Sequence, residues 1–294
     1  MMVTVLALAA ALSYGVADFL GGAVARRSTA LKALTWCVPT GLVLVLAAAL
    51  LIGGTPGAAG SAWGFAAGVT GGTGLITFYR ALARGPMSVV APVSALAAAI
   101  LPIAVGTMRG ERLDALVMVG VLLCLVAIGL VSMEEGAPDG TAPAPTGRRR
   151  LLDSGPVMAG VSGACFGVFF ILLKEAGDGN GLWPLVAARA GNLAVVLVAL
   201  ALVARPGTDQ GGPRVKGRAL IALALLSGTL DAGANVLYFL AVHSGMLSLA
   251  AVLTSLYPAI TVLLARLTYG ERLRVVQQVG MAVAVAGVAL VTAG

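Results

Sequence analysis

Charged residues are scarce in this chain. Asp, Glu, Lys and Arg make up 11% of its 294 residues, whereas a soluble domain typically carries about 25%. With 59% apolar residues and a mean hydropathy of +1.01, the chain lacks the polar surface that a water-soluble or disordered protein needs. The composition therefore predicts an all-α integral membrane protein with almost no part outside the lipid bilayer.

Residues that carry catalysis or bind metals are also few. The chain has one histidine, His243, and its three cysteines show neither metal-ligand nor disulfide spacing. No HExxH, GxSxG or Walker motif is present, so we expect no enzyme, no cofactor and no ATP drive within this chain. No basic run is interleaved with aromatic residues, so we expect the net charge of +7 to reflect membrane topology rather than nucleic-acid binding.

Long apolar runs predict ten transmembrane helices. The first run lacks a recognisable cleavage pattern and is expected to remain as a helix. The longest polar segment, 133–154, contains three prolines and three consecutive arginines, and is expected to link a first repeat, 1–132, to a second repeat, 155–294. The predicted spans are 3–24, 33–53, 62–83, 87–108, 115–132, 155–174, 182–204, 219–242, 246–267 and 274–293.

The two halves resemble each other in sequence. Residues 78–131 align without a gap on 238–291, with 15 identities in 54 pairs. The identities include Gly-Glu-Arg-Leu at 110–113 and again at 270–273. Five helices per repeat is an odd number, so the second repeat must cross the membrane in the opposite sense. This pattern predicts two inverted five-helix repeats, an architecture that recurs in transporters.

The loops predict the orientation. Of the 19 Lys and Arg residues, 15 lie in the loops and helix ends predicted on one side of the membrane. Three lie on the other side, and Arg189 lies within a predicted span. Because positive charge is retained in the cytoplasm, both termini are expected outside. We expect a bacterial-type inner (plasma) membrane, with the protein a monomer or a homodimer.

The paired hairpins "RALARGPMSVVAPVSALAAAILPIAVGTMRGERL" and "LAVHSGMLSLAAVLTSLYPAITVLLARLTYGERL", and the opening "SYGVADFLGG", carry a family resemblance. They resemble the drug/metabolite transporter superfamily, specifically its EamA-type ten-helix members. Some members of that family place both termini in the cytoplasm, the reverse of what the charges predict here. The resemblance implies a secondary transporter of a small metabolite, amino-acid-like compound or drug, exporting it in exchange for protons. The alternative is an uncoupled facilitator or importer on the same fold.

Asp231 is the strongest candidate for a mechanistic residue. It lies 13 residues after Arg218 and 12 before His243, so it is roughly 18–20 Å from either flank of its span. A carboxylate at that depth is costly and is usually functional. Asn235 and Tyr238 share its helix face, and we expect this face to line a cavity. Asp231 then carries a proton or pairs with a cationic substrate; the alternative is a structural ion pair with Arg189.

Four polar residues on other predicted helices join this set. Asp18, with Tyr14 one turn before it, is expected either to act in transport or to pair with Arg26 or Arg27 near the surface. Arg189 is expected to bind a substrate carboxylate or to pair with Asp231, and Asn192 lies one turn further along.

The predicted spans 87–108 and 246–267 contain prolines together with Ser94 and Tyr257. Proline frees a backbone carbonyl, and freed backbone is tolerated inside a membrane only within protein or beside a cavity. The resemblance implies that these two helices line the central pathway; the alternative is a packing kink. Glu111 and Glu271 precede helix starts and are expected to be structural.

Overall fold

The computed structural model describes residues 2–84, 87–110, 114–132, 155–177, 179–203, 217–269 and 275–293. Within these ranges every regular element is an α-helix, as the composition predicted. Six segments are long and apolar enough to cross a membrane: Met2–Arg27, Ala30–Ile52, Val157–Glu175, Trp183–Leu202, Arg218–His243 and Leu247–Thr268. The protein is therefore an all-α, multi-pass membrane protein.

The helices are α1 (Met2–Arg27), α2 (Ala30–Ile52), α3 (Ala58–Arg84), α4 (Met87–Met108), α5 (Ala115–Ser132), α7 (Gly155–Glu175), α8 (Trp183–Val203), α9 (Arg218–His243), α10 (Leu247–Thr254), α11 (Tyr257–Tyr269) and α12 (Val275–Ala293).

One predicted span differs from the structure. The sequence predicts a continuous helix over 246–267, but the helix is interrupted between α10 and α11. Pro258 lies in the first turn of α11, where its missing N–H costs no hydrogen bond. In a continuous helix Pro258 would fail to donate to the carbonyl of Thr254 and its ring would clash there. The break one turn before Pro258 relieves both problems.

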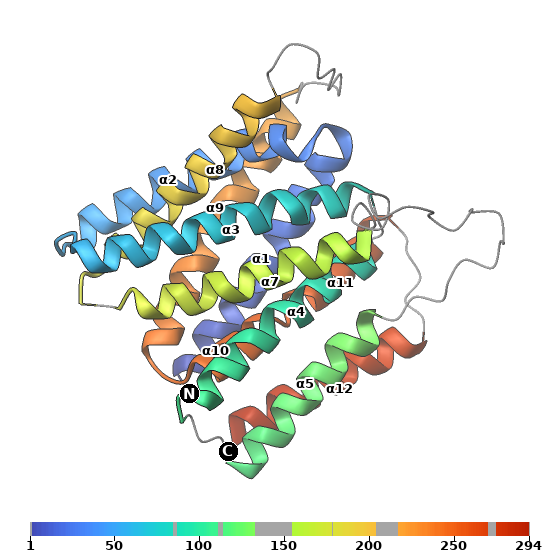
Figure 1. The fold of residues 1–294 in the computed structure, drawn as a ribbon. Helices are drawn as coiled ribbons and strands as arrows, with labels where there is room; N and C mark the ends of the chain where they lie inside the picture. Colours follow the sequence, from blue (N-terminus) through green and yellow to red (C-terminus); the bar gives the residue numbers. More distant parts are fainter. Residues whose placement is uncertain are drawn as a thin grey trace.

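The helices form an antiparallel bundle in which short connections join several neighbours in sequence, such as α1 to α2 and α9 to α10 (Figure 1). The N-terminus and the C-terminus lie at the same end of the bundle (Figure 1). Helices α5 and α12 pack side by side along one edge of the molecule. Buried residues of α1, α2, α3 and α9 form much of the core.

Helices of the first half pack mainly against helices of the second half. The most extensive contacts join α3 to α8 and α7, α1 to α9, α4 to α7, and α5 to α12. Each of these contacts crosses the segment 133–154 that separates the halves in sequence. The centre of the bundle is therefore built jointly by residues from before and after that segment.

A stripe of glycines on α3 lets α8 approach closely. Gly60, Gly64, Gly68 and Gly72 are four residues apart and face α8. A Cβ on Gly68 would lie 1.8 Å from the carbonyl oxygen of Ala188, which no side chain tolerates. Small residues at this spacing allow two membrane helices to pack backbone against backbone. This contact sets the distance between α3 and Arg189, the residue that follows Ala188.

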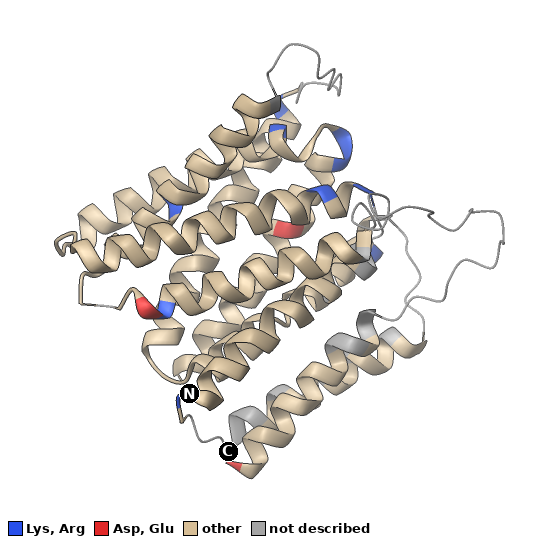
Figure 2. Ribbon diagram, viewed as in Figure 1, with Lys and Arg blue, Asp and Glu red and all other residues tan. Residues whose placement is uncertain are grey.

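The two ends of the bundle differ in charge. Figure 2 shows most of the described Lys and Arg residues at the end where α1, α3 and α11 finish. At the opposite end, Arg109 forms an ion pair with Glu175. Lys174 Nζ at that end donates to the backbone carbonyls of Val242 (2.5 Å) and Gly245 (3.3 Å), which ties the end of α7 to the turn between α9 and α10.

Candidate functional site

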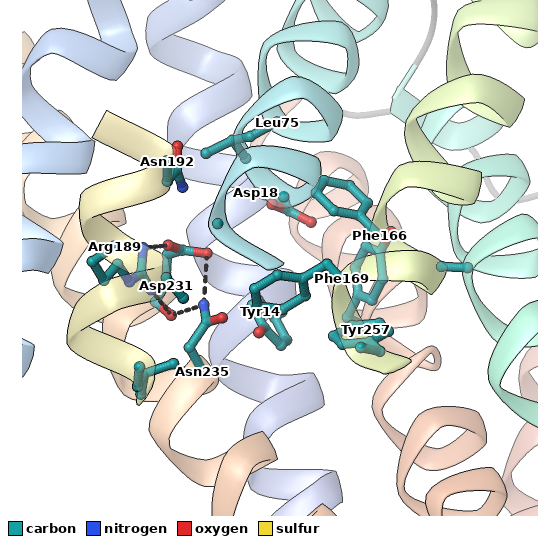
Figure 3. A pocket seen from close by; sticks show the side chains of 16 residues that line it. Tyr14, Asp18, Leu75, Phe166, Phe169, Arg189, Asn192, Asp231, Asn235 and Tyr257 are labelled. Carbon is teal, nitrogen blue, oxygen red and sulfur yellow. Dashed lines mark hydrogen bonds and ion pairs between the residues drawn. The ribbon is translucent and has the colours of Figure 1, made fainter. Parts of the chain in front are cut away.

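A cavity lies in the middle of the bundle, lined by residues from seven helices (Figure 3). Its volume is about 60 Å³, which corresponds to space for roughly four to six water molecules. Both halves of the chain contribute to the lining: α1, α3 and α4 from the first, and α7, α8, α9 and α11 from the second. The lining residues are Tyr14, Asp18, Gly68, Gly71, Leu75, Ala98, Phe166, Phe169, Phe170, Leu185, Ala188, Arg189, Asn192, Asp231, Asn235 and Tyr257.

An ion pair between α8 and α9 occupies one side of the cavity (Figure 3). Arg189 Nη1 lies 2.5 Å from Asp231 Oδ2, and Arg189 Nη2 donates to the backbone carbonyl of Asp231 at 2.9 Å. The Arg189 side chain is 4% exposed and that of Asp231 19%. Asn235 Nδ2 donates to the same backbone carbonyl at 2.7 Å. Of the two alternatives for Arg189, the structure therefore contains the pair with Asp231.

Asp18 lies on the other side of the cavity and has no such partner. Its side chain is buried, with the residue 8% exposed, and no hydrogen bond or ion pair reaches its carboxylate from the described residues. The expectation that Asp18 pairs with Arg26 or Arg27 is wrong. Helix α1 continues to Arg27, so Asp18 is about 12 Å along the axis from Arg26, and Arg26 instead donates to the carbonyl of Leu82.

Two further polar atoms in the lining are buried without a hydrogen-bond partner among the described residues. They are Oδ1 of Asn192 and the hydroxyl oxygen of Tyr257. The two residues are 9% and 5% exposed, respectively. Buried polar atoms are nearly always paired, and unpaired ones in a native fold call for an explanation such as a ligand or water.

Aromatic rings form the wall that faces Asp18 in Figure 3. Phe166, Phe169 and Phe170 follow one another along a single face of α7, because they are spaced three and four residues apart. Phe166 meets Phe78 edge-on at 5.9 Å between ring centroids, and this contact fixes its ring. Tyr14 and Tyr257 lie 6.3 Å apart, centroid to centroid.

The structure brings together seven of the nine residues proposed from the sequence: Tyr14, Asp18, Arg189, Asn192, Asp231, Asn235 and Tyr257. Ser94 and Tyr238 are outside the lining. Ser94 instead shares a hydrogen bond with Ser162, with 2.9 Å between their oxygens. Tyr238 packs on Phe170 at 4.3 Å between centroids. The helix face of Asp231 thus reaches the cavity over one turn only, because neighbouring helices cover its ends.

The aromatic wall was missed from the sequence. A Phe cluster at helical spacing is common in any apolar core, so the sequence alone gave it no distinct meaning. Glu111 and Glu271 lie outside the described residues. Within the described part of the chain, no group of three or more His, Cys, Asp or Glu residues is arranged to hold a metal ion.

Comparison with known proteins agrees with the resemblance inferred from the motifs. Residues 153–293 match the profile of the EamA-like transporter family. A solved structure, described only as the crystal structure of a protein, covers 99% of this chain and 96% of its own, with a TM-score of 0.69 at 20% sequence identity. At that identity the likeness concerns the fold alone. No curated protein matches the sequence. Residues 153–293 are therefore an EamA-type transporter domain of the drug/metabolite transporter superfamily.

Proposed function

We propose that the protein is a secondary transporter that exports a small metabolite, amino-acid-like compound or drug across the plasma membrane in exchange for protons. The central cavity carries this proposal, because it combines buried charges with an apolar wall midway along a bundle of membrane-crossing helices. Ionisable groups at such depth are costly and mark substrate and proton pathways. The carboxylates of Asp18 and Asp231 are the acids that line the cavity, beside the guanidinium of Arg189 and the phenols of Tyr14 and Tyr257.

We further propose ten spanning helices arranged as two inverted repeats, 1–132 and 155–294, with α10 and α11 together forming the ninth. The packing supports this arrangement. If α1 corresponds to α7, α2 to α8, and α3 to α9, then the contact of α1 with α9 has its counterpart in that of α7 with α3. The contact of α3 with α8 likewise has its counterpart in that of α9 with α2. Such pairing is what a twofold axis in the membrane plane produces.

Alternating access follows from this architecture. Because the cavity walls come from both repeats, rotation of one repeat against the other would open the cavity first to one side of the membrane and then to the other. The Lys174 tether and the Arg109–Glu175 pair would hold one end closed in the present state. An importer or an uncoupled facilitator would use the same movement, so direction and coupling need a direct test.

The test is a metabolite profile of cells and medium for wild type, Asp18→Asn, Asp114→Asn and empty vector at matched membrane expression. Asp114 is an exposed acid outside the cavity, so Asp114→Asn is a matched control. One compound is expected to accumulate outside with wild type and Asp114→Asn, and not with Asp18→Asn or vector. Depletion of that compound from the medium would indicate import. Export that persists after the proton gradient is collapsed would indicate a facilitator, and four identical profiles would contradict the proposal.

A further inference from the structure

The cavity holds one more acid than base. Its acidic and basic groups are Asp18 from α1, Arg189 from α8 and Asp231 from α9. Arg189 and Asp231 neutralise each other through their ion pair. Helices α3, α4 and α7 contribute no ionisable side chain to the lining, and Tyr14 and Tyr257 contribute neutral phenols. The carboxylate of Asp18 is therefore left without a counter-charge, and burying an unpaired charge is strongly unfavourable.

Two buried oxygen atoms in the same cavity also have no hydrogen-bond partner among the described residues. They are Asn192 Oδ1 and the Tyr257 hydroxyl oxygen. Arg189 directs Nη1 to the side chain and Nη2 to the backbone carbonyl of Asp231. A ligand with a positive charge and N–H donors would therefore supply what the carboxylate of Asp18 and the unpaired oxygens lack.

The apolar part of the lining limits the size and the character of the ligand. Phe166, Phe169 and Leu75 offer an apolar surface, and aromatic faces also attract cations. The cavity volume of about 60 Å³ restricts the hydrocarbon part of a ligand to a few carbon atoms in this state.

We propose that the cavity binds a small, singly protonated aliphatic amine, with its ammonium group at Asp18 and its hydrocarbon part against Phe166 and Phe169. The proposal rests on the proposed function, since the amine is taken to be the transported substrate. It narrows the substrate class, because a zwitterionic amino acid would bring a carboxylate whose natural partner, Arg189, is already bound to Asp231. Quaternary ammonium ions fit less well, since they cannot donate to Asp18, Asn192 or Tyr257.

Binding to the purified full-length protein in detergent tests this inference, by isothermal titration with four probes. The probes are n-butylammonium, tetramethylammonium, norvaline and butyrate, all at the same ionic strength. We expect n-butylammonium to bind at least about tenfold more tightly than tetramethylammonium, since charge-assisted N–H hydrogen bonds are lost in the latter. Norvaline and butyrate are expected not to bind. Norvaline or butyrate binding as tightly as n-butylammonium would overturn the proposal, as would no binding of n-butylammonium.

Variants at Asp18 separate a binding role from a structural one. Asp18→Asn is expected to weaken n-butylammonium binding about tenfold or more, whereas Asp18→Glu and the distant Asp114→Asn retain it. Without ligand, Asp18→Asn is expected to melt at the same temperature as wild type or higher, because it removes an unpaired buried charge. Unchanged affinity in Asp18→Asn, or a lower melting temperature of that variant without ligand, would overturn the assignment.

Uptake of n-butylammonium into proteoliposomes distinguishes failure of this inference from failure of the proposed function. If n-butylammonium binds in an Asp18-dependent way but is not taken up into vesicles, the proposed amine site is supported and transport of this probe is contradicted. If the metabolite profile shows export of a compound of another class and n-butylammonium does not bind, the transporter function is supported and the proposed amine site is contradicted. Binding and uptake that both depend on Asp18 support the two together.

Discussion

Removal of the charge on Asp231 is expected to destabilise the fold severely unless the charge on Arg189 is removed as well. In Asp231→Asn the guanidinium of Arg189 stays buried, with its side chain 4% exposed. It keeps neutral acceptors, namely the amide oxygen and the backbone carbonyl of residue 231 at 2.9 Å, but loses its counter-charge. Breaking a buried ion pair on one side typically costs about 3–5 kcal/mol. A loss of 3 kcal/mol corresponds to a fall in melting temperature of roughly 6–12 °C.

The double variant Arg189→Gln/Asp231→Asn places two neutral amides at the same positions, where they can share a hydrogen bond. Replacing both charges of a buried pair is often nearly neutral, so we expect the double variant to recover most of the loss. The assay is the apparent melting temperature of purified protein in one detergent at one scan rate, because membrane proteins of this size often unfold irreversibly. A double variant as unstable as the sum of the two single variants would refute the reasoning, as would an Asp231→Asn that melts with wild type.

Three other predictions follow from the packing and the charges. Gly68→Ala is expected to lower the melting temperature or abolish expression, because its Cβ would meet the Ala188 carbonyl oxygen at 1.8 Å; the control Gly160→Ala, with no neighbour within 4 Å of the new Cβ, is expected to be neutral or slightly stabilising. Lys174→Met is expected to speed amide hydrogen exchange at the turn between α9 and α10, because it removes the bonds to Val242 and Gly245. The exposed ion pair of Arg109 is worth less than about 1 kcal/mol, so Arg109→Gln serves as the control, and equal exchange in the two variants would contradict the tether. A reporter fused to the C-terminus is expected to be extracytoplasmic, as the Lys and Arg bias predicts; activity of a cytoplasmic reporter would reverse the topology.

The helices could be predicted from the sequence because each apolar run is long and is bounded by charges or glycines. The interruption before Pro258 was not predicted, since a proline inside an apolar run is compatible both with a kink and with a full break. The choice depends on what the backbone at the break meets, and α1 supplies that contact: a Cβ on Gly15 would lie only 2.6 Å from the carbonyl oxygen of Tyr257. Such a contact between distant parts of the chain leaves no local signal.

The charged and polar residues of the candidate site could be found from the sequence because such residues are rare within apolar spans. The roles of the two acids could not be ranked from depth alone. Asp231 is the deeper of the two in the sequence, yet the structure pairs it with Arg189 and leaves Asp18 without a partner among the described residues. The roles of the two acids depend on which of them faces Arg189 across the bundle. That arrangement is set by the rotation of each helix about its axis and by close contacts such as that of α3 with α8.

The packing of each half of the chain mainly against the other half constrains how the protein is made. Synthesis of residues 155–294 takes roughly 10–30 s after the first five helices are complete. During that interval the buried faces of α1 and α3, with Asp18 and the glycine stripe, lack the helices of the second half that form their most extensive contacts in the finished bundle. An uncovered carboxylate is costly in lipid, so the early helices must be held at the insertion machinery, or beside water, until α7, α8 and α9 arrive. We therefore expect that residues 1–132 expressed alone do not fold into a stable unit.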